Sequence, residues 1–284
     1  MSTNIIDDLK KTNKRLSKSH NKIAHFIQEE YDKAAFMTAS KLSKVVGVSE
    51  STVVRFATTL GYEGYPQMQR ALQEIMRHRL TSAQRFNMTA HLSSEDIVSS
   101  VLSSDIKNIQ DAMEHVDSMT FDKVVEAISH SKTKYVLGLR SAAPLADFLA
   151  HYLYYIFDDV EVVMARSRAI YESMARIDKD DCLIAISFPR YSTRTLESMR
   201  LAKKRGSTVI GITDGILSPL HDVSDLCLDA STRISSFVDS MAAPMALVNA
   251  LLTALGKHNE ESLRKNLHEL EALWQENREY TDNV

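Results

Sequence analysis

Residues 49 to 58 place small hydrogen-bonding side chains and one arginine at helical spacing. Ser51, Thr52 and Arg55 fall on the polar side of such a helix, whereas Val53 and Phe56 fall on its apolar side. Hydroxyls near a helix N-terminus and an arginine able to bond guanine suit a helix that reads base edges in the major groove of DNA. An ordinary surface helix with one apolar stripe is the alternative interpretation.

A second set of polar residues follows two apolar, strand-like runs. Hydroxyls and free N–H groups at the start of a helix, with guanidinium groups nearby, form a site for phosphate or carboxylate. Simple Ser/Thr capping is the alternative, but a cap needs one hydroxyl and the second loop offers four. The first loop supplies Arg140 and Ser141, and the second supplies Ser187, Arg190, Ser192, Thr193, Arg194 and Thr195.

Few residues point to catalysis or to metal binding. Glu172 and His221 are the candidates for the general base of an aldose–ketose isomerase, but no spacing pairs either with a partner. The ten histidines form no H-x-x-x-H pattern and no Cys/His cluster, so we expect no metal. Cys182 and Cys227 lie in apolar runs and are expected to be buried and reduced. We predict no catalytic residue and no cofactor.

The front of the chain predicts an all-helical domain over residues 1–80, which presents the first set of side chains. Gly47 permits a sharp turn between two helices, and Ser49 is expected to cap the second of them. The preceding helix is expected to begin at Thr38 or Ser40. Its inward-pointing residues are expected to be Leu42, Val45 and Val46.

From Lys134 onward, short aliphatic runs alternate with helical segments. The runs cover residues 135–139, 160–164, 182–186, 208–212 and 226–228. Buried strands separated by helices indicate a parallel, doubly wound five-stranded sheet. Ligands bind beyond the carboxyl ends of such strands, where both polar loops lie. We therefore expect an α/β domain over residues 119–284, with Thr120 capping its first helix.

Residues 81–118 are expected to form a linker and a connecting helix. The pattern over residues 97–116 is strongly helical, and its apolar stripe could pack on the second domain or pair with a second copy.

The net charge of −3 hides an asymmetry between the two halves of the chain. The balance is +4 over Met1–Arg77 and −7 over the remainder, so the front is the part suited to phosphate backbones. The length of 284 residues accommodates two domains. Met1–Lys22 lacks the apolar core of a signal peptide, and the apolar run Met241–Leu255 is too short to cross a bilayer. We expect a cytoplasmic protein with no membrane partner.

The motifs in both halves resemble one bacterial family. The front resembles the helix-turn-helix domain of RpiR-type transcription regulators, through Leu42, the run Gly47–Phe56 and the run Leu60–Tyr65. The back looks like the sugar-isomerase (SIS) domain that this family fuses to it, a phosphosugar-binding module. The resemblance covers nearly the whole chain and implies a dimeric or tetrameric repressor or activator whose DNA affinity responds to a sugar phosphate.

The phosphate loop of the family carries over only in part. In the usual I-S-x-S-G-x-T pattern, Ser187 matches the first serine and Ser192 stands at the threonine, while Thr195 matches a hydroxyl that often follows. Pro189 replaces the second serine and Arg190 the glycine. In the first loop, a second glycine and a serine are replaced by Arg140 and Ala142, and Ser141 remains. An acidic sugar, a sugar acid phosphate or another carboxylate fits the added arginine charge at least as well as a plain sugar phosphate.

The combined prediction is a DNA-binding transcription regulator controlled by a phosphosugar or related anionic sugar metabolite, with an aldose–ketose phosphate isomerase as the alternative. Two-fold symmetry in a homodimer or homotetramer predicts a palindromic operator in double-stranded DNA. The identity of the effector, the operator sequence and the direction of regulation stay open. The residues expected at the DNA are Lys41, Lys44, Ser49, Glu50, Ser51, Thr52 and Arg55; those expected at the effector are Arg140, Ser141, Ser187, Arg190, Ser192, Thr193 and Thr195.

Overall fold

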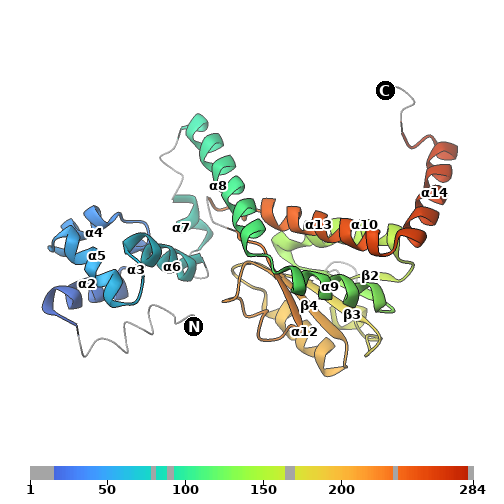
Figure 1. Ribbon diagram of the computed structural model, residues 1–284, viewed down its shortest axis with the longest axis horizontal. Helices are drawn as coiled ribbons and strands as arrows, with labels where there is room; N and C mark the ends of the chain where they lie inside the picture. The colour runs from blue at the N-terminus through green and yellow to red at the C-terminus, as the bar shows by residue number, and fades with distance from the viewer. Residues whose placement is uncertain (1–15, 78–80, 88–92, 164–169, 233–235, 281–284) are drawn as a thin grey trace. The chain divides into compact units, whose positions relative to one another are not determined.

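The computed structural model describes residues 16–77, 81–87, 93–163, 170–232 and 236–280. The chain divides into two compact units, Met1–Phe86 and Asn87–Val284 (Figure 1). The finer division into 1–80, 81–118 and 119–284 stays a prediction. No helix within the described ranges combines the length and the apolar character that a membrane span requires.

The first unit is helical in its described residues. Ser17, Thr38 and Ser49 each accept a hydrogen bond from the backbone N–H three residues ahead and so cap a helix. The hydroxyl of Tyr65 donates to the carbonyl of Met37 at 2.6 Å and ties α6 (Tyr65–Arg77) to the turn before α4 (Ala39–Val46). The helices are α2 (Lys18–Glu29), α3 (Tyr31–Ala34), α4 (Ala39–Val46), α5 (Glu50–Thr59) and α6 (Tyr65–Arg77), followed by α7 (Ser82–Asn87).

The core of this unit is small and apolar, and one residue expected in it lies outside. Leu42 is fully buried, whereas Val45 is 52% exposed, contrary to the prediction that it points inward. Leu42 and Val46 are four residues apart and define the inner face of α4, so Val45 falls to one side of that face. The buried residues include Ile23, Ile27, Leu42, Val53, Phe56, Met68 and Leu72.

The second unit contains the predicted five-stranded parallel sheet. Its strands are β1 (Lys134–Gly138), β2 (Val160–Val163), β3 (Cys182–Ile186), β4 (Thr208–Thr213) and β5 (Leu226–Asp229), in the order β2-β1-β3-β4-β5. All four neighbouring pairs are parallel, which confirms the predicted α/β fold class. Met164, expected in the second strand, lies outside the described residues.

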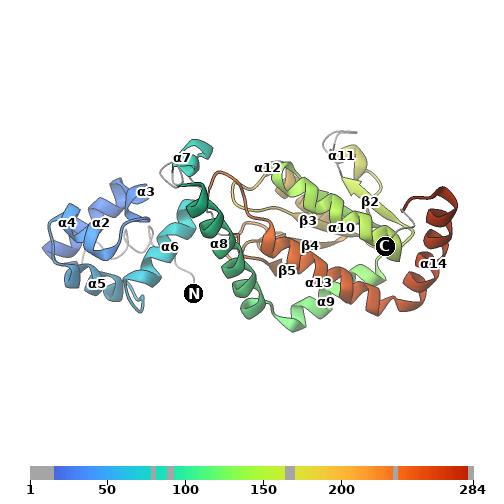
Figure 2. The same cartoon turned by 90° about the horizontal axis from the view of Figure 1, so that it is seen from above.

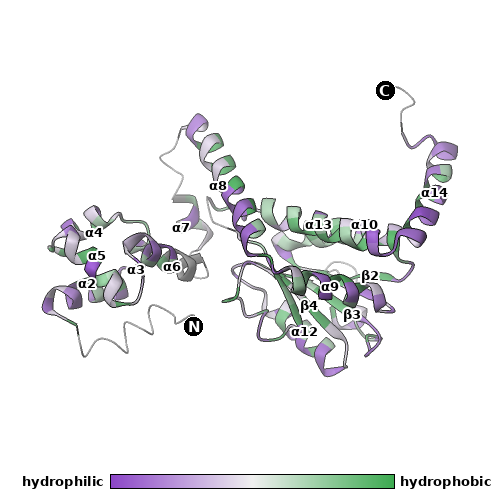
Figure 3. Ribbon diagram, in the orientation of Figure 1, coloured by the Kyte–Doolittle hydropathy of each residue, from purple (hydrophilic) through white to green (hydrophobic). Residues whose placement is uncertain are grey.

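Helices cover both faces of this sheet, each over its own apolar core. On one face, α9 (Ser118–His130), α10 (Ala143–Ile156) and α13 (Ala242–His258) pack on strand residues such as Val136, Ile184 and Ile210 (Figures 1 and 2). On the other face, α11 (Ile170–Ser173) and α12 (Thr193–Lys204) pack on Leu137, Leu183 and their neighbours. The hydrophobic residues are concentrated in the strands and in α10 and α13 (Figure 3).

Two further helices, α8 (Ser94–His115) and α14 (Glu260–Asn277), flank this unit. Helix α8 packs against α13 and is capped by Ser93, yet Ile106 and Met113 on its apolar stripe are 56% and 76% exposed. The cap of α9 differs from the prediction: Asp117, not Thr120, accepts the bond from the N–H of Thr120, at 2.9 Å. Thr120 is therefore the third residue of the helix, and its hydroxyl also donates to Asp117.

Both cysteines are reduced. Cys182 is buried and Cys227 is half-buried. Burial raises the pKa of Cys182 to about 11 and the pKa of Cys227 to about 12, so each is a neutral thiol at physiological pH.

Candidate functional site

Helices α4 and α5 form a helix-turn-helix whose turn is fixed by Gly47. Its φ of +72° is left-handed, a conformation that glycine adopts without a steric cost. The N–H groups of Gly47 and Val48 both donate to the carbonyl of Ser43, at 2.9 and 3.0 Å, and close the end of α4. Ser49 then starts α5 two residues after the turn, by accepting from the N–H of Thr52 at 3.2 Å.

The predicted polar face of α5 is exposed, and its apolar face is buried. Val53 and Phe56 are fully buried, whereas Ser51 and Arg55 are exposed and Thr52 is half-buried. This separation holds the second helix on the unit while leaving its hydrogen-bonding groups available to a partner.

The hydroxyls at the start of α5 bond to one another. The Oγ of Ser49 lies 2.9 Å from Ser51 Oγ and 2.7 Å from Thr52 Oγ1. Arg55 Nε donates to the Ser51 carbonyl at 3.3 Å, which draws the guanidinium toward the same turn. The seven residues expected at the DNA therefore lie on two consecutive helices and the turn between them, and Lys41, Lys44 and Glu50 are all exposed.

The two predicted anion loops meet at one edge of the sheet in the second unit. Strands β1 and β3 are neighbours, and Gly138 pairs with Ile186 at their carboxyl ends, so the loops that follow begin side by side. A Cβ on Gly138 would lie 2.6 Å from the Ala142 carbonyl oxygen and 2.6 Å from Ala146 Cβ. Glycine there lets the first loop and α10 approach the sheet closely.

The start of α12 leaves hydrogen-bonding groups unused. Ser192 is its N-cap residue, but its side chain makes no capping hydrogen bond. Thr195, in the first turn, is fully buried, and its hydroxyl has no hydrogen-bond partner among the described residues. A buried hydroxyl without a partner is costly, so the site suits a ligand atom that supplies the missing bond. Ser187, which directly follows β3, is 6% exposed, whereas Thr193 is exposed.

Arg140 and Arg190 both adopt left-handed backbone conformations. Their φ angles are +58° and +69°, and both side chains are exposed. For a residue with a Cβ this conformation costs about 1–2 kcal/mol. At both positions the resemblance to the family implies glycine, a residue that adopts this conformation without a steric cost.

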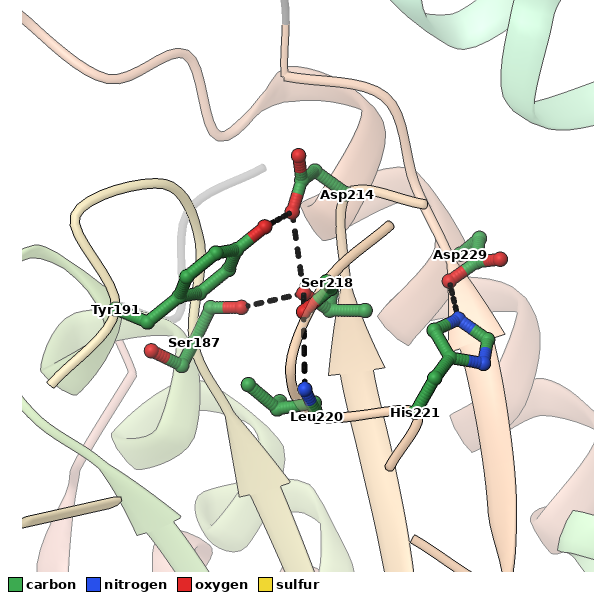
Figure 4. A network of polar contacts seen from close by, with 8 residues as sticks. Ser187, Tyr191, Asp214, Ser218, Leu220, His221 and Asp229 are labelled. Atoms are coloured by element: carbon green, nitrogen blue, oxygen red, sulfur yellow. Dashed lines mark hydrogen bonds and ion pairs between the residues drawn. The ribbon is translucent and has the colours of Figure 1, made fainter. Parts of the chain in front are cut away.

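A buried hydroxyl network supports the second loop from beneath. Thr213, fully buried at the end of β4, donates to the Ser187 carbonyl at 2.8 Å, and its Oγ1 lies 2.7 Å from the hydroxyl oxygen of Ser218. Asp214 accepts a 2.6 Å hydrogen bond from the hydroxyl of Tyr191 (Figure 4). Thr213 and Asp214 are not among the site residues that the sequence predicts. Their position directly after a strand, at the same edge as the two loops, was the available signal.

The first loop is in contact with an acid that the sequence did not indicate. Ser141 Oγ donates to Asp239 Oδ2 at 2.9 Å, across 98 positions of the chain. Asp239 therefore places a carboxylate at the candidate anion site.

The two candidates for an isomerase base lie in opposite halves of the sheet. Glu172 is exposed in α11, which follows the edge strand β2, whereas His221 lies between β4 and the other edge strand, β5. His221 Nε2 is 2.9 Å from Asp229 Oδ1 (Figure 4). Burial raises the pKa of Asp229, and His221 partly offsets that shift.

Two family models match consecutive parts of the chain. Residues 3–78 match the helix-turn-helix domain of the rpiR family, and residues 127–254 match the SIS domain.

Two curated relatives are named HTH-type transcriptional regulators. The chain is 26% identical over 235 residues to the HTH-type transcriptional regulator HexR of Pseudomonas aeruginosa, covering 80% of this chain and 78% of that protein. It is 23% identical over 230 residues to an uncharacterised HTH-type transcriptional regulator of Haemophilus influenzae, covering 80% of each.

The sugar isomerase domain of an RpiR transcription factor from Sphaerobacter thermophilus superposes with a TM-score of 0.59 at 26% identity, covering 62% of this chain and 98% of that one. The Vibrio vulnificus NanR protein complexed with ManNAc-6P gives a TM-score of 0.60 at 21% identity, covering 99% and 100%, and shares the fold.

Proposed function

Because this chain belongs to the RpiR-type regulators, with an rpiR-family helix-turn-helix domain followed by a SIS domain, we propose that a small anionic sugar metabolite controls its affinity for operator DNA. Ser51, Thr52 and Arg55 read base edges in this proposal, and Lys41 and Lys44 meet the phosphate backbone. Paired copies of the chain would read a palindromic operator, with half-sites about 10 base pairs apart or a multiple of that.

The observation that carries the effector half of the proposal is the buried Thr195 hydroxyl without a described partner, at an α12 start that no side chain caps. An anionic oxygen seated there would accept from free N–H groups and gain the helix dipole. Arg140 and Arg190 border the same edge of the sheet and supply positive charge. The Vibrio vulnificus NanR protein, whose structure is complexed with ManNAc-6P, supports a phosphosugar as the class of ligand.

We do not propose isomerase activity for this chain. A proton transfer along a sugar carbon chain needs a base within hydrogen-bond reach of the substrate. Glu172 and His221 follow strands in opposite halves of the sheet, so they cannot act together on one bound sugar.

A thermal-shift screen of the full chain against phosphorylated sugars and sugar acids tests the effector, since a ligand of the folded state raises the melting temperature. The DNA half is tested on a duplex that the full chain selects from a random pool. Its affinity should fall steeply as salt rises, because released counterions drive the binding. Turnover of any of these sugar phosphates in an activity assay would contradict the proposal. So would an affinity for the selected duplex that does not change with salt concentration.

A further inference from the structure

Two features of the second unit support inferences that go beyond the proposed function. The first is a group of three potential metal ligands on and beside the edge strand β5. His221, Cys227 and Asp229 place one ligand atom each within 4.8 Å of one another, and all three residues are half-buried. In the sequence they are separated by five residues and by one, a spacing that matches neither H-x-x-x-H nor a Cys/His cluster, and the fold of the loop onto β5 brings them together.

We propose that these three residues bind one borderline divalent cation of the Zn²⁺ class. An imidazole nitrogen, a thiolate sulfur and a carboxylate oxygen are the three donor types that Zn²⁺ prefers, and three protein ligands leave a fourth position for water. The Cys227 thiol gives up its proton to solvent on binding. Gly211 pairs with Cys227 across the ladder, and a Cβ there would lie 2.9 Å from the sulfur, so glycine keeps space beside it.

A purely structural role predicts something different for the thiol. The 2.9 Å hydrogen bond between His221 and Asp229 can by itself hold the loop onto β5. The His221–Asp229 pair needs no contribution from Cys227, whereas a cation bound at this site needs the Cys227 thiolate as a ligand. The experiment therefore tests whether the Cys227 sulfur binds the metal ion.

The test titrates the full chain with Co²⁺, whose bond to a thiolate adds a charge-transfer absorption in the near ultraviolet. One Co²⁺ per chain is expected, displaced by Zn²⁺, with the absorption lost in Cys227→Ala and kept in the matched control Cys182→Ala. Asp229→Asn keeps the shape of the side chain and should weaken Zn²⁺ binding at least tenfold. No thiolate absorption, or an absorption that survives in Cys227→Ala, would overturn the site.

The second feature is a loop that contacts both the candidate anion site and helix α8. Within residues 236–241, Asp239 accepts from Ser141 at 2.9 Å, and the adjacent Ser240 donates to Asp105 Oδ1 of α8 at 2.6 Å. Ser231, just upstream, lies 3.5 Å from Oδ1 of the fully buried Asn108, also on α8. Adjacent residues thus face the site and the helix that follows the DNA-binding unit in the chain.

We infer that Asp239 occupies the anion site until the effector displaces it, and that Ser240 carries the displacement to α8. This inference rests on the proposed function. An anion and the Asp239 carboxylate compete for the Ser141 hydroxyl and repel each other, so they cannot share it. When Asp239 leaves, Ser240 moves with it and its bond to Asp105 breaks.

Inorganic phosphate is the probe, with binding followed by phosphorus NMR and α8 followed by hydrogen exchange in the full chain. Phosphate should speed exchange around Asp105, and Asp239→Asn should lower the Kd roughly tenfold by removing one negative charge. Ser240→Ala should bind phosphate more tightly than wild type, because the bond to Asp105 no longer has to break, and its α8 should exchange fast from the outset. Ser236→Ala in the same loop serves as the control.

The outcomes separate the inference from the function beneath it. If phosphate binds and exchange in α8 does not change, the loop mechanism is wrong and the anion site stands. If phosphate fails to bind the wild type and Asp239→Asn, both are wrong.

Discussion

The hydroxyl of Tyr191 donates a 2.6 Å hydrogen bond to Oδ1 of Asp214, which joins the loop after β3 to the end of β4. Asp214 is 9% exposed, so a lost donor there is not simply replaced by water. This bond holds the loop that leads into the candidate anion site.

Tyr191→Phe should lower the free energy of unfolding by about 1–2 kcal/mol, because it leaves a mostly buried carboxylate short of one donor. The looser loop should also raise the Kd for phosphate several-fold. Urea unfolding and phosphorus NMR measure the two effects. Tyr171→Phe removes a similar 2.8 Å bond to Glu197 on an exposed tyrosine and should change neither; equal effects in both variants would contradict a special role for Tyr191.

The left-handed backbone of Arg190 predicts a rank order of stabilities. Arg190→Gly relieves backbone strain of about 1–2 kcal/mol in the folded state, but glycine gives the unfolded chain more conformational entropy, which costs about 0.5–1 kcal/mol. The net change in the free energy of unfolding should therefore stay within about 1 kcal/mol. Arg190→Val should be the least stable, because a β-branched side chain tolerates positive φ poorly. Denaturant unfolding of both variants checks this order, and a valine variant as stable as the glycine variant would refute it.

Arg55 and Lys44 should affect DNA binding in different ways. Arg55→Ala should cost about 1–3 kcal/mol on the selected duplex and relax the preference at one base position. Lys44→Ala should weaken binding to all duplexes alike and reduce the salt slope by about 1. Fluorescence anisotropy across a salt series measures both effects. Lys107→Ala, which removes an exposed lysine of α8, serves as the control. If the two variants behave alike, the assigned roles are wrong.

Tyr65 predicts how stability responds to alkaline pH. Burial raises its pKa from 10.0 to about 12, so the folded state keeps the phenol proton that the unfolded state loses. Its contribution is fully present below pH 10 and declines as pH rises from about 10 to about 12. The helix-turn-helix unit of wild type should lose stability more steeply over this window than Tyr65→Phe, measured by circular dichroism of the full chain.

The parts of the fold that sequence could predict are those fixed by local chemistry. The strands are runs of aliphatic residues, and the α5 cap follows from a serine placed after a glycine turn, so both were confirmed. The α9 cap was assigned three residues late because Asp117 and Thr120 are both good capping residues and the pattern alone does not rank them.

Long-range contacts set the limit of prediction at the candidate site. Nothing near Ser141 in the chain indicates Asp239, because 98 positions separate the two residues. The network beneath the loop depends on which strands are neighbours, which the run of strands along the chain does not determine. Which of the predicted residues bind DNA or effector stays a prediction.

The two left-handed arginines also bear on how such a protein can change over evolutionary time. Arginine and glycine codons can differ by a single base, and at positive φ the backbone of these loops accommodates either residue. One nucleotide change can therefore add or remove a positive charge at the candidate anion site without rebuilding the loop. The preference for one metabolite over another can then change while the sheet that carries these loops stays the same.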